Sequence, residues 1–395
     1  MTNVLIVGAG SIGKAILGEL IRNKTDTTIT IMDKNRSKLN TIRRTLNTLT
    51  ETPKLNLLTD ISKLHQNVDV VINATNPENN IKLMKFALKK KADYIDLGSN
   101  PFKGPGISPD SLFDSQIALT DRFKQSKKIA ITNTGAAPGL SDLIIKRNIV
   151  RNGLHTANIG IYFYQEIISD RLISSWSPEI LLFESIMPGT TYKQGQIQSI
   201  IGKDKFREVQ FPRIGKKNVI LFNTHPELKT VPFYLKEEID SIQVGGNLNF
   251  NGLELPELIL ELIQQNLFKK LTDESIFEKL CATFDNKTDF VEYYKKGKVE
   301  FERITPLITI EDVENRIAVH TSLTIQHAND KNPFANATSF ITSILPSVLT
   351  EELLLEEISE KGVIAPAGLS DSERILLKCS RRGLALKTKK DRKKS

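Results

Sequence analysis

The sequence has little of what several protein classes require. Its two cysteines, Cys281 and Cys379, cannot build a disulfide framework and lack the spacing of a metal site. No apolar run approaches the roughly 18 residues of a membrane-spanning helix. Residues 1–3 lead directly into an apolar segment without a basic flank or a cleavage site, so no secretory signal is predicted. We therefore expect a soluble, cytoplasmic protein with reduced thiols.

Motifs of several enzyme classes are also missing. The chain has no Gly-Lys-Ser/Thr phosphate loop, no paired-histidine zinc motif and no Gly-x-Ser-x-Gly nucleophile elbow. Its five histidines are far apart in the sequence. We therefore expect no metal site.

Positive charge is concentrated at the C-terminus. The formal net charge is +8, of which residues 387–395 carry +5, and this leaves +3 for the rest of the chain. A basic end on a nearly neutral body is typically solvated, so residues 386–395 are predicted to be a disordered basic tail. Nucleic acid is therefore not an expected partner. The alternative is a salt-sensitive contact of this tail with RNA or an acidic surface.

The N-terminal part of the chain alternates strand-like and helix-like segments. Short apolar or β-branched runs of the kind that suits buried strands recur in this part of the chain. They lie at residues 4–7, 28–32, 68–75, 94–97 and 129–132. Residues with helical periodicity fill the intervals. The alternation predicts an α/β fold with a Rossmann-type, doubly wound parallel sheet.

A glycine-rich loop follows the first predicted strand. Its predicted cofactor contacts are Gly8, Gly10, Ser11, Ile12 and Gly13. In a dinucleotide-binding loop, Gly8 permits the tight turn, Gly10 lets the backbone approach a pyrophosphate, and Gly13 lets the helix pack closely on the strand. The free N–H groups at the helix start favour the anion. Asp33 ends the second predicted strand, and its spacing from Gly13 is that of a ribose-binding carboxylate.

The same segment carries opposing cues about the coenzyme. Asp33 favours NAD because its carboxylate repels a 2′-phosphate, whereas Arg36 can pair with that phosphate. The choice between NAD and NADP therefore stays open, with the carboxylate favouring NAD slightly.

Three further loops follow predicted strands of this sheet. Ligands of such sheets bind beyond the carboxyl ends of the strands, which nominates residues 74–77, 98–101 and 134–139. The candidate contacts in these loops are Ala74, Thr75, Asn76, Ser99, Pro138 and Gly139. The alternative is ordinary turn chemistry, since Asn-Pro and Pro-Gly pairs mark turns in many settings.

The strict alternation ends after residue 142. Residues 156–164 and 316–327 alternate as half-buried strands do, and residues 190–235 are typical of hairpins and loops. Near the end, residues 339–349 and 351–360 are predicted to be helices, and Ser370-Asp371 is expected to cap another. This half is predicted to be an α+β domain with a mostly antiparallel sheet.

These motifs, in their order over residues 3–383, resemble the saccharopine dehydrogenase family, in the branch with saccharopine reductases and carboxynorspermidine dehydrogenases. Besides the glycine loop, residues 137–140 are similar to its Asp-Pro-Gly loop and residues 246–252 to its Gly-Thr-Leu-Arg-Tyr-Pro-Gly element. The resemblance implies an adenine-side contact at Asp60 and a homodimer. It also implies three segments: an NAD(P)-binding domain of residues 1–139 plus about 360–385, a substrate-binding and dimerisation domain of 140–359, and the tail.

Two departures from the family pattern concern the substrate. Asn249 stands where the family element has an arginine, and Ala137 replaces the acidic residue of the Asp-Pro-Gly loop. Without the guanidinium, bidentate recognition of a carboxylate is lost, so saccharopine itself is not the expected substrate.

The resemblance implies hydride transfer between a nicotinamide and a C–N bond, imine or secondary amine, of an amino-acid or polyamine-like substrate. The titratable candidates for proton transfer are Asp142, Tyr164, Glu179 and His225. The candidate substrate contacts are Ser99, Pro138, Gly139, Trp176, Glu179 and Asn249. Two alternatives stay open: a related-fold reductase acting on a non-amino substrate, and a catalytically inactive, dinucleotide-binding regulatory protein.

Overall fold

The protein is described by a computed structural model that places most of the 395 residues. The described residues are 2–23, 27–47, 54–100, 112–175, 177–265, 267, 273–284, 289–327 and 331–392. They form two compact units. The first comprises residues 2–100, 112–140 and 331–382, and the second comprises residues 141–327 and 383–392.

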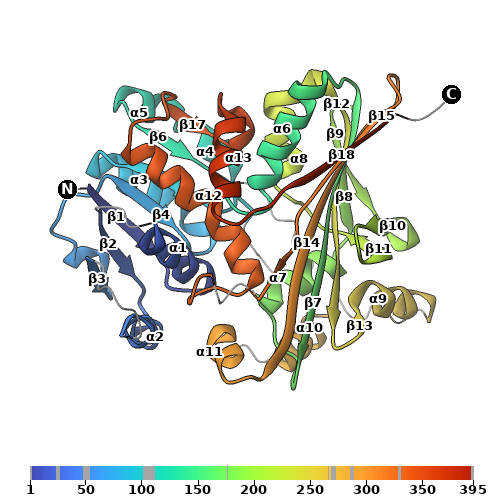
Figure 1. Cartoon of the computed structure of the whole chain (residues 1–395), viewed down its shortest axis with the longest axis horizontal. Coiled ribbons are helices and arrows are strands. Elements are labelled where there is room, and N and C mark those ends of the chain that lie inside the picture. Colours follow the sequence, from blue (N-terminus) through green and yellow to red (C-terminus); the bar gives the residue numbers. More distant parts are fainter. Residues whose placement is uncertain are drawn as a thin grey trace. The chain divides into compact units, whose positions relative to one another are not determined.

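The first unit is built on a seven-stranded parallel sheet (Figure 1). In sheet order its strands are β17 (Gly362–Ile364), β6 (Ile129–Ile131), β5 (Asp93–Asp96), β4 (Val70–Asn73), β1 (Thr2–Val7), β2 (Thr27–Met32) and β3 (Leu55–Leu58). The order reverses at β1, so that β4 and β2 lie on its two sides. Val4 to Val7 are buried because helices cover both faces of the sheet. The predicted doubly wound Rossmann-type sheet is confirmed.

Helices lie on both sides of this sheet. They are α1 (Ser11–Arg22), α2 (Arg36–Leu46), α3 (Asn80–Lys90), α4 (Phe113–Ile117), α5 (Thr120–Gln125), α12 (Ala337–Leu354) and α13 (Ser372–Arg381). Leu83 of α3 and Phe123 of α5 share one apolar core with Leu5 of β1. On the other side, α12 packs against α1. Asp371 caps α13 as predicted, since its side chain accepts a hydrogen bond from the N–H of Arg374 (3.0 Å).

Helix α12 differs from the sequence-based expectation. Residues 339–349 and 351–360 were predicted to be two helices, but one helix continues through Pro346 and ends at Leu354. The helix begins at a capping box in which the Asn336 side chain accepts from the N–H of Ser339. Its interior is almost wholly buried, so tertiary packing compensates for the missing proline N–H.

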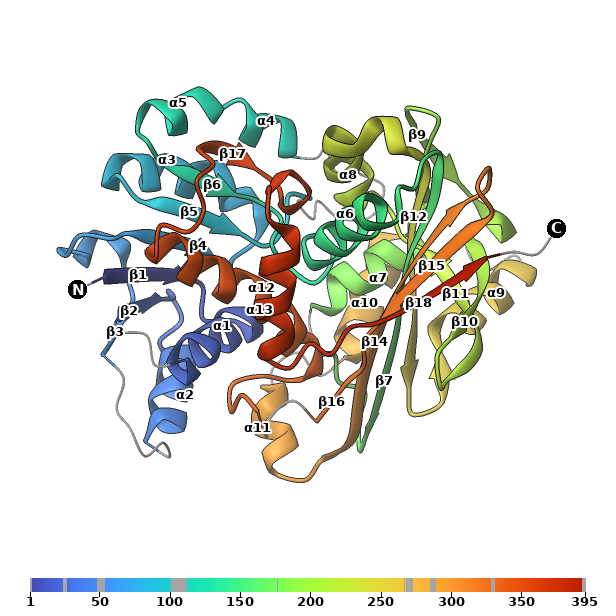
Figure 2. The same cartoon turned by 45° about the horizontal axis from the view of Figure 1, so that its top comes forward.

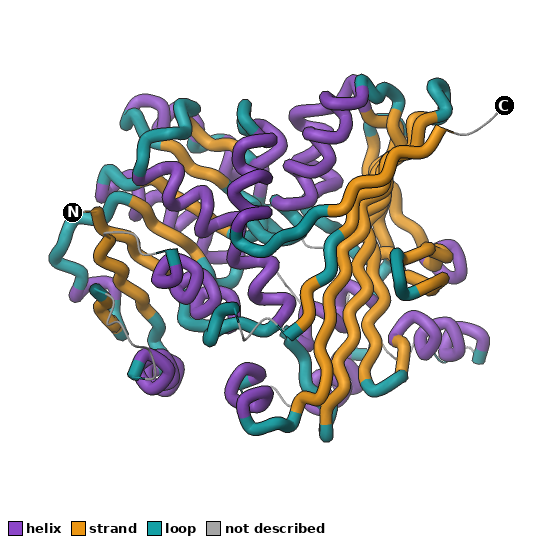
Figure 3. Tube along the Cα trace, viewed as in Figure 1, coloured by secondary structure: helices purple, strands orange, loops and turns teal. Residues whose placement is uncertain are grey.

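The second unit contains a larger mixed sheet of eleven strands (Figures 2 and 3). Its main path runs β10 (Phe206–Phe211), β11 (Gly215–Leu221), β12 (Ile239–Phe250), β7 (Ala157–Ser169), β14 (Val299–Asp312), β15 (Ile317–Ser322) and β18 (Lys387–Arg392). The strands β8 (Gly189–Lys193), β9 (Gln196–Ile200), β13 (Leu253–Glu254) and β16 (Ile325–Gln326) branch from it. Within the described residues, the pair of β12 with β7 is parallel and the other pairs are antiparallel. The predicted α+β domain with a mostly antiparallel sheet is confirmed.

The helices of the second unit cover this sheet. They are α6 (Leu140–Asn152), α7 (Pro178–Ile186), α8 (Glu227–Leu235), α9 (Leu255–Gln264), α10 (Glu274–Thr283) and α11 (Phe290–Lys295). An apolar core joins Leu182 of α7, Phe277 of α10 and Phe290 of α11 to Ile167 and Leu248 of the sheet. The alternating residues of β7 and β12 explain this arrangement, because each strand turns one set of side chains toward the helices.

The basic C-terminal segment requires a correction. It was predicted to be a disordered tail, but residues 387–392 form β18, which pairs antiparallel with β15. Thr388 lies opposite Thr321, and their hydroxyl groups are 3.0 Å apart. Backbone pairing does not require apolar side chains, and charged residues are common on edge strands because they discourage further pairing. Residues 393–395 lie outside the described residues.

The division into units also differs from the expected boundaries. Residues 331–359, expected in the second domain, fall in the first unit with α12. Among the described residues, no helix combines the length and the apolar character needed to cross a membrane.

Candidate functional site

The glycine loop joins β1 to α1 with the geometry that a bound anion requires. Gly8 has a φ of +106°, and a Cβ there would lie 2.6 Å from the carbonyl oxygen of Ala74. A Cβ on Gly13 would lie 1.9 Å from the carbonyl oxygen of Gly8. At Gly10, by contrast, a Cβ would meet no atom within 4 Å. Gly8 and Gly13 therefore allow the close packing of the strand and the helix, whereas Gly10 borders open space at the start of the helix.

Among the described residues, no side chain caps the N-terminus of α1. Its N-cap residue is Gly10, which makes no side-chain capping bond, and its first turn contains no acidic residue. The unpaired N–H groups and the dipole of this twelve-residue helix favour a negative charge. Ser11 and Ile12 in the first turn are both partly exposed. The loop therefore has the form of a phosphate cradle.

Asp33 connects this loop to the end of β2. Its Oδ2 accepts from the N–H of Ala9 (2.8 Å) and its Oδ1 from the N–H of Asn35 (2.8 Å). The Nζ of Lys38 is 3.8 Å from Oδ2. Arg36 begins α2 and is exposed, a short distance along the chain from the carboxylate. Asp33 and Arg36, which favour NAD and NADP respectively, therefore both follow the carboxyl end of β2.

Two buried asparagines link the loops that follow β4 and β5. The side chain of Asn73 at the end of β4 accepts from the N–H (2.9 Å) and the hydroxyl group (2.6 Å) of Thr75. Its Nδ2 donates to Oδ1 of Asn80 (2.7 Å), and Nδ2 of Asn80 donates to the carbonyl oxygen of Gly98 (2.9 Å). Ala74, Thr75 and Ser99 thus lie in loops held by one hydrogen-bond chain. Asn76 is the N-cap residue of the following short helix, makes no side-chain capping bond and is exposed.

Asp96 performs the same linking role between β5 and β6. It is fully buried at the carboxyl end of β5. Its Oδ1 accepts from the N–H of Asn133 (2.8 Å) and its Oδ2 from Nε2 of Gln116 (2.5 Å). Its backbone carbonyl oxygen accepts from the N–H and the hydroxyl group of Thr134 (both 2.8 Å). Burial raises the pKa of Asp96 to about 7, although these hydrogen bonds act in the opposite direction.

The loop after β6 closes on itself. The N–H of Leu140 donates to the carbonyl oxygen of Gly135 (3.0 Å). Gly139 has a φ of +120°, and a Cβ there would lie 2.6 Å from the carbonyl oxygen of Asn133. Pro138 beside it is buried. These contacts explain the need for glycine at position 139, and α6 begins directly after it.

Several buried polar atoms in these loops and in α4 have no hydrogen-bond partner in the described part of the chain. They are Ser99 Oγ, both amide atoms of Asn100, Asn133 Oδ1 and Gln116 Oε1. Native proteins satisfy nearly all such atoms, so a group of unsatisfied ones indicates a place for a bound ligand. The atoms of Ser99, Asn100 and Asn133 lie just after β5 and β6, at the edge where ligands of open α/β sheets bind, and Gln116 of α4 reaches that edge through Asp96.

In the second unit, acidic side chains surround one histidine. Nδ1 of His225 contacts Oε2 of Glu227, whose Oε1 accepts from the hydroxyl group of Ser141 (2.9 Å). The neighbouring Asp142 accepts from the hydroxyl group of Thr230 (2.9 Å) through Oδ2. All five side chains are at least nine-tenths buried. Two of the four predicted proton-transfer candidates, Asp142 and His225, are therefore in one cluster.

The charges of this cluster are strongly coupled. Burial alone lowers the pKa of His225, but the carboxylates of Glu227, Glu184 and Asp142 outweigh it and raise that pKa above its ordinary value. Burial raises the pKa of Glu184 to about 7. Three carboxyl groups share one imidazole, so the cluster retains acidic protons or an excess of negative charge near neutral pH. This cluster (Ser141, Asp142, Glu184, His225, Glu227 and Thr230) is called the acid–histidine cluster below.

Tyr164 and Asn249 form a separate group on the sheet. Nδ2 of Asn249 donates to the Tyr164 hydroxyl oxygen (3.2 Å), and its Oδ1 accepts from the N–H of Gly252 (2.8 Å). The guanidinium carbon of Arg303 lies 5.3 Å from the centre of the Tyr164 ring. Burial raises the pKa of Tyr164. Both amide atoms of Asn249 are therefore engaged within the sheet.

The remaining candidates do not join these groups. Glu179 in the first turn of α7 accepts from the hydroxyl group of Ser177 (2.6 Å) and is partly exposed. Trp176 lies outside the described residues. Asp60 follows β3 and caps a short helix, and hydrogen bonds from Ser62 hold its pKa below the ordinary value. Within the described residues, no group of three or more His, Cys, Asp or Glu side chains is arranged to hold a metal ion.

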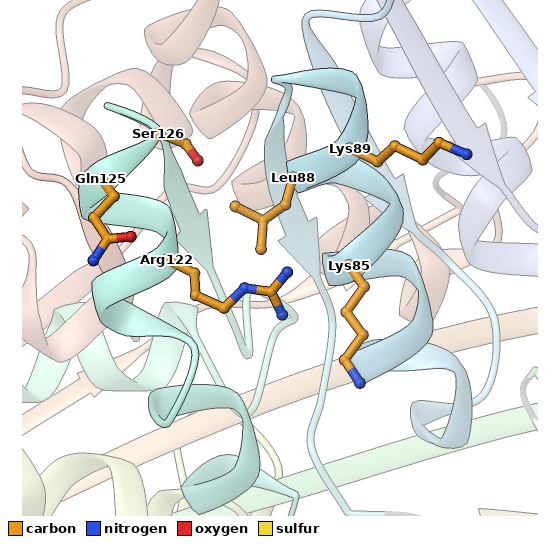
Figure 4. A pocket seen from close by; sticks show the side chains of 6 residues that line it. All are labelled: Lys85, Leu88, Lys89, Arg122, Gln125 and Ser126. Atoms are coloured by element: carbon orange, nitrogen blue, oxygen red, sulfur yellow. The ribbon is translucent and has the colours of Figure 1, made fainter.

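A surface pocket of about 270 Å³ lies elsewhere on the first unit (Figure 4). It is lined by three residues of α3, two of α5 and the residue that follows α5, namely Lys85, Leu88, Lys89, Arg122, Gln125 and Ser126. Leu88 points into the space between the two helices. The last turns of α3 and α5 precede the amino ends of β5 and β6, so the pocket is not at the ligand edge of the sheet.

Comparison with known proteins agrees with this geometry. Residues 4–131 match the model of the saccharopine dehydrogenase NADP binding domain family. The resemblance predicted from the sequence is confirmed, and the cofactor class of this domain is NAD(P).

Solved structures extend the similarity over the whole chain. Saccharopine dehydrogenase (L-Glu forming) from Saccharomyces cerevisiae is 14% identical, with 99% of this chain and 100% of that chain covered and a TM-score of 0.65. Homospermidine synthase from Legionella pneumophila, solved with NAD, is 15% identical, with coverages of 98% and 91% and a TM-score of 0.72. No curated protein sequence matches the chain. The chain therefore has a saccharopine dehydrogenase-like, NAD(P)-binding oxidoreductase fold.

Several residues that the structure brings to these groups were not predicted from the sequence. In the first unit they are Asn73, Asn80, Asp96, Gln116 and Asn133, and in the second Ser141, Glu184, Glu227 and Thr230. Asn73 and Asp96 had a usable signal, because each is the polar residue that ends a buried strand of a parallel sheet. The others come from distant segments and had none.

Proposed function

We propose that this protein is an NAD(P)-dependent dehydrogenase that transfers a hydride at a C–N bond of an amino-acid or polyamine-like substrate. In the reductive direction, the hydride goes to the imine carbon and a proton goes to the nitrogen, which gives a secondary amine. The coenzyme supplies the hydride chemistry, and the chain binds, orients and exchanges protons.

The acid–histidine cluster is the observation that carries the proposal. The cluster contains three carboxyl groups but a single imidazole, and its members are buried or at most partly exposed. The local environment therefore favours the binding of a cation. A protonated amine supplies that charge. The cluster also holds exchangeable protons near neutral pH, because Glu184 has its pKa raised to about 7. In the sequence, Ser141 and Asp142 directly follow the Gly139–Leu140 end of a ligand-edge loop.

The roles we propose within the cluster follow from its contacts. Glu227 orients the His225 ring through Nδ1, which leaves Nε2 as the nitrogen that exchanges a proton with the substrate. Asp142 and Glu184 hold the cation through their charge. The proposed cofactor contacts are the glycine-loop residues, Asp33 and the loops at Thr75 and Ser99, all at carboxyl ends of strands in one sheet.

Coenzyme binding is the first test. Gly10→Asp and Gly10→Ala form a matched pair, because a Cβ at this position meets no atom within 4 Å and neither substitution strains the fold. The aspartate variant is expected to weaken binding of NADH or NADPH by about a hundredfold, as charge-assisted contacts are worth about 1.5–3 kcal/mol each. Coenzyme fluorescence measures the affinity. Equal affinities of the two variants contradict the phosphate-cradle assignment.

Turnover is the second test. Oxidation of NAD(P)H is followed with imine-forming pairs of a carbonyl compound and an amine, with the same carbonyl compounds alone as controls. Consumption that requires the amine supports the proposal. Consumption with the carbonyl compound alone identifies a reductase of non-amino substrates, and coenzyme binding without any turnover identifies a regulatory protein.

His225→Gln tests the cluster within the same assay. The glutamine preserves hydrogen bonding to Glu227 but does not titrate, so kcat is expected to fall by about a hundredfold. Coenzyme affinity should stay unchanged, since the glycine loop is untouched. A His225→Gln enzyme with full kcat excludes the histidine from proton transfer.

A further inference from the structure

The carboxyl group of Asp96 is buried without a cation. Both of its oxygens accept hydrogen bonds from uncharged groups, the N–H of Asn133 and the side-chain amide of Gln116. No ion pair among the described residues involves Asp96. The titratable group that faces it is Tyr94 on the same strand, and Asn133, Gln116 and the N–H of Gly98 face it from the other elements. A buried carboxylate without a counter-ion is costly, so its retention at a ligand edge calls for a role.

The position of Asp96 gives it control over two loops. On one side, its carboxylate and its backbone carbonyl oxygen hold Asn133 and Thr134. Asn133 has a φ of +60°, a left-handed conformation that asparagine tolerates better than most other non-glycine residues. On the other side, residues 98–100 follow Asp96 directly. The unsatisfied buried atoms of Ser99, Asn100 and Asn133 therefore lie in the two segments next to this carboxylate.

We propose that Asp96 is a positioning residue that couples proton uptake to ligand binding at the carboxyl edge of the sheet. The inference rests on the proposed function, because the ligand in question is the NAD(P) coenzyme. Ionised, Asp96 accepts both hydrogen bonds and holds Asn133 and Gln116 in the arrangement observed. When Asp96 is protonated, its carboxyl group carries an O–H donor that requires a hydrogen-bond acceptor.

Gln116 supplies that acceptor. Its Nε2 donates to Oδ2 of Asp96, while its Oε1 is buried and has no partner in the described residues. Rotation of the amide by about 180° exchanges the two atoms, so that a protonated Asp96 donates to Oε1. The exchange takes place at Oδ2, and the loss of the negative charge at the same time weakens the hydrogen bond from the N–H of Asn133 to Oδ1, which holds the loop after β6. Burial raises the pKa of Asp96 to about 7, so this exchange falls in the physiological range.

Coenzyme affinity across the pH range from about 5.5 to about 8.5 tests the proposal in the full chain. The dissociation constant of NADH and NADPH is expected to rise about tenfold below neutral pH in the wild type, since each pH unit below the pKa changes the ionised fraction tenfold. Asp96→Asn removes the titration and should flatten this profile. Asp93→Asn is the matched control: Asp93 begins the same strand, pairs with Lys128 (3.2 Å) and should leave the profile unchanged. Identical profiles of wild type and Asp96→Asn overturn the proposal.

Gln116→Met keeps the test decisive if Asp96→Asn does not fold. Methionine has a similar volume and cannot donate, so it removes a hydrogen bond that lowers the pKa of Asp96. The midpoint of the affinity profile should therefore move to higher pH. An unmoved midpoint contradicts the role of Gln116.

A readout without coenzyme separates this inference from the proposed function. In the apoprotein, the side-chain amide resonance of Gln116 and the backbone amide resonance of Asn133 should shift with pH, with a midpoint near 7, and the shift should vanish in Asp96→Asn. Resonances that do not titrate overturn the inference whether or not coenzyme binds. Resonances that titrate in a protein without coenzyme affinity overturn the proposed function and leave the proton-linked exchange in place.

Discussion

Asp96 in the first unit and the acid–histidine cluster in the second show two different ways of burying acidic groups. In the first, Asp96 has only uncharged hydrogen-bond donors around it. In the second, Glu227 and Asp142 share a buried cluster with His225 and hydroxyl groups. Burial raises the pKa of Asp96 to about 7, whereas the carboxylates of the cluster raise that of the imidazole. Similar burial thus yields an isolated acid in one unit and a mutually compensated group in the other.

Replacing Asp96 should have the largest effect, which is on the pH dependence of the free energy of unfolding. The folded pKa of Asp96 is about 7 against an ordinary 3.8, so the folded state keeps a proton that the unfolded state releases. The free energy of unfolding should therefore fall by about 3 kcal/mol as the pH rises from about 4 to about 7. In Asp96→Asn, this fall in the free energy of unfolding should be absent. Chemical denaturation at both pH values measures it, and parallel behaviour of the two proteins contradicts it.

Lys205 extends the comparison to a buried base. Its Nζ donates to the carbonyl oxygens of Ser185 (2.9 Å) and Met187 (2.5 Å) at the end of α7, and burial lowers its pKa to about 7. Here the unfolded state binds the proton more tightly. Stability should therefore rise with pH above neutrality, by about 2–3 kcal/mol between about pH 7 and about pH 9. Lys205→Met should abolish this rise, and the exposed Lys203→Met is the control; an unchanged rise in Lys205→Met refutes the assignment.

Glu227→Gln tests whether the cluster is compensated. The raised pKa of His225 stabilises the folded state at pH values below the ordinary histidine pKa, and this contribution is lost as the pH rises through the folded pKa. Without the Glu227 charge, burial dominates and the pKa of His225 should fall below its ordinary value. Stability at about pH 5 should then drop by about 1–2 kcal/mol relative to pH 8. NMR titration of the ring checks the pKa; a pKa that stays raised shows that Glu184 and Asp142 suffice.

The smallest effect concerns the coenzyme end of the first unit. Asp33→Ser should shift the ratio of NAD to NADP affinity toward NADP by about tenfold, because a repulsive charge near a 2′-phosphate is removed. Arg36→Ala should shift it in the opposite direction. The ratio is measured with both reduced coenzymes by fluorescence. If Asp33→Ser leaves the ratio unaltered, its carboxylate serves only Ala9 and Asn35.

Much of the first unit was predictable from sequence because its signals are local. The strand that begins at Val4, the glycines after it and Asp33 follow one another closely in the chain, and the backbone beside Gly8 and Gly13 leaves no room for a side chain. The doubly wound parallel sheet was predictable from the alternation of short buried runs with helical segments. The cap at Asp371 was equally local.

Other features depended on distant partners. β18 forms because β15, which lies much earlier in the chain, offers a free edge, and the composition of the basic segment gave no sign of that edge. The cluster joins Asp142 to Thr230 and Ser141 to Glu227, and both pairs are far apart in the sequence. Asp142 and His225 were predicted as candidates for proton transfer, but no local signal in the sequence pairs them with Glu227 or Glu184.

The sequence by itself determined the dinucleotide loop, the parallel sheet and the class of cofactor, because these depend on steric and hydrogen-bonding requirements of neighbouring residues. Only the tertiary structure decided which buried acids stand alone and which share a histidine. Protonation depends on the charges and donors within a few ångströms, and these come from segments that only folding brings together.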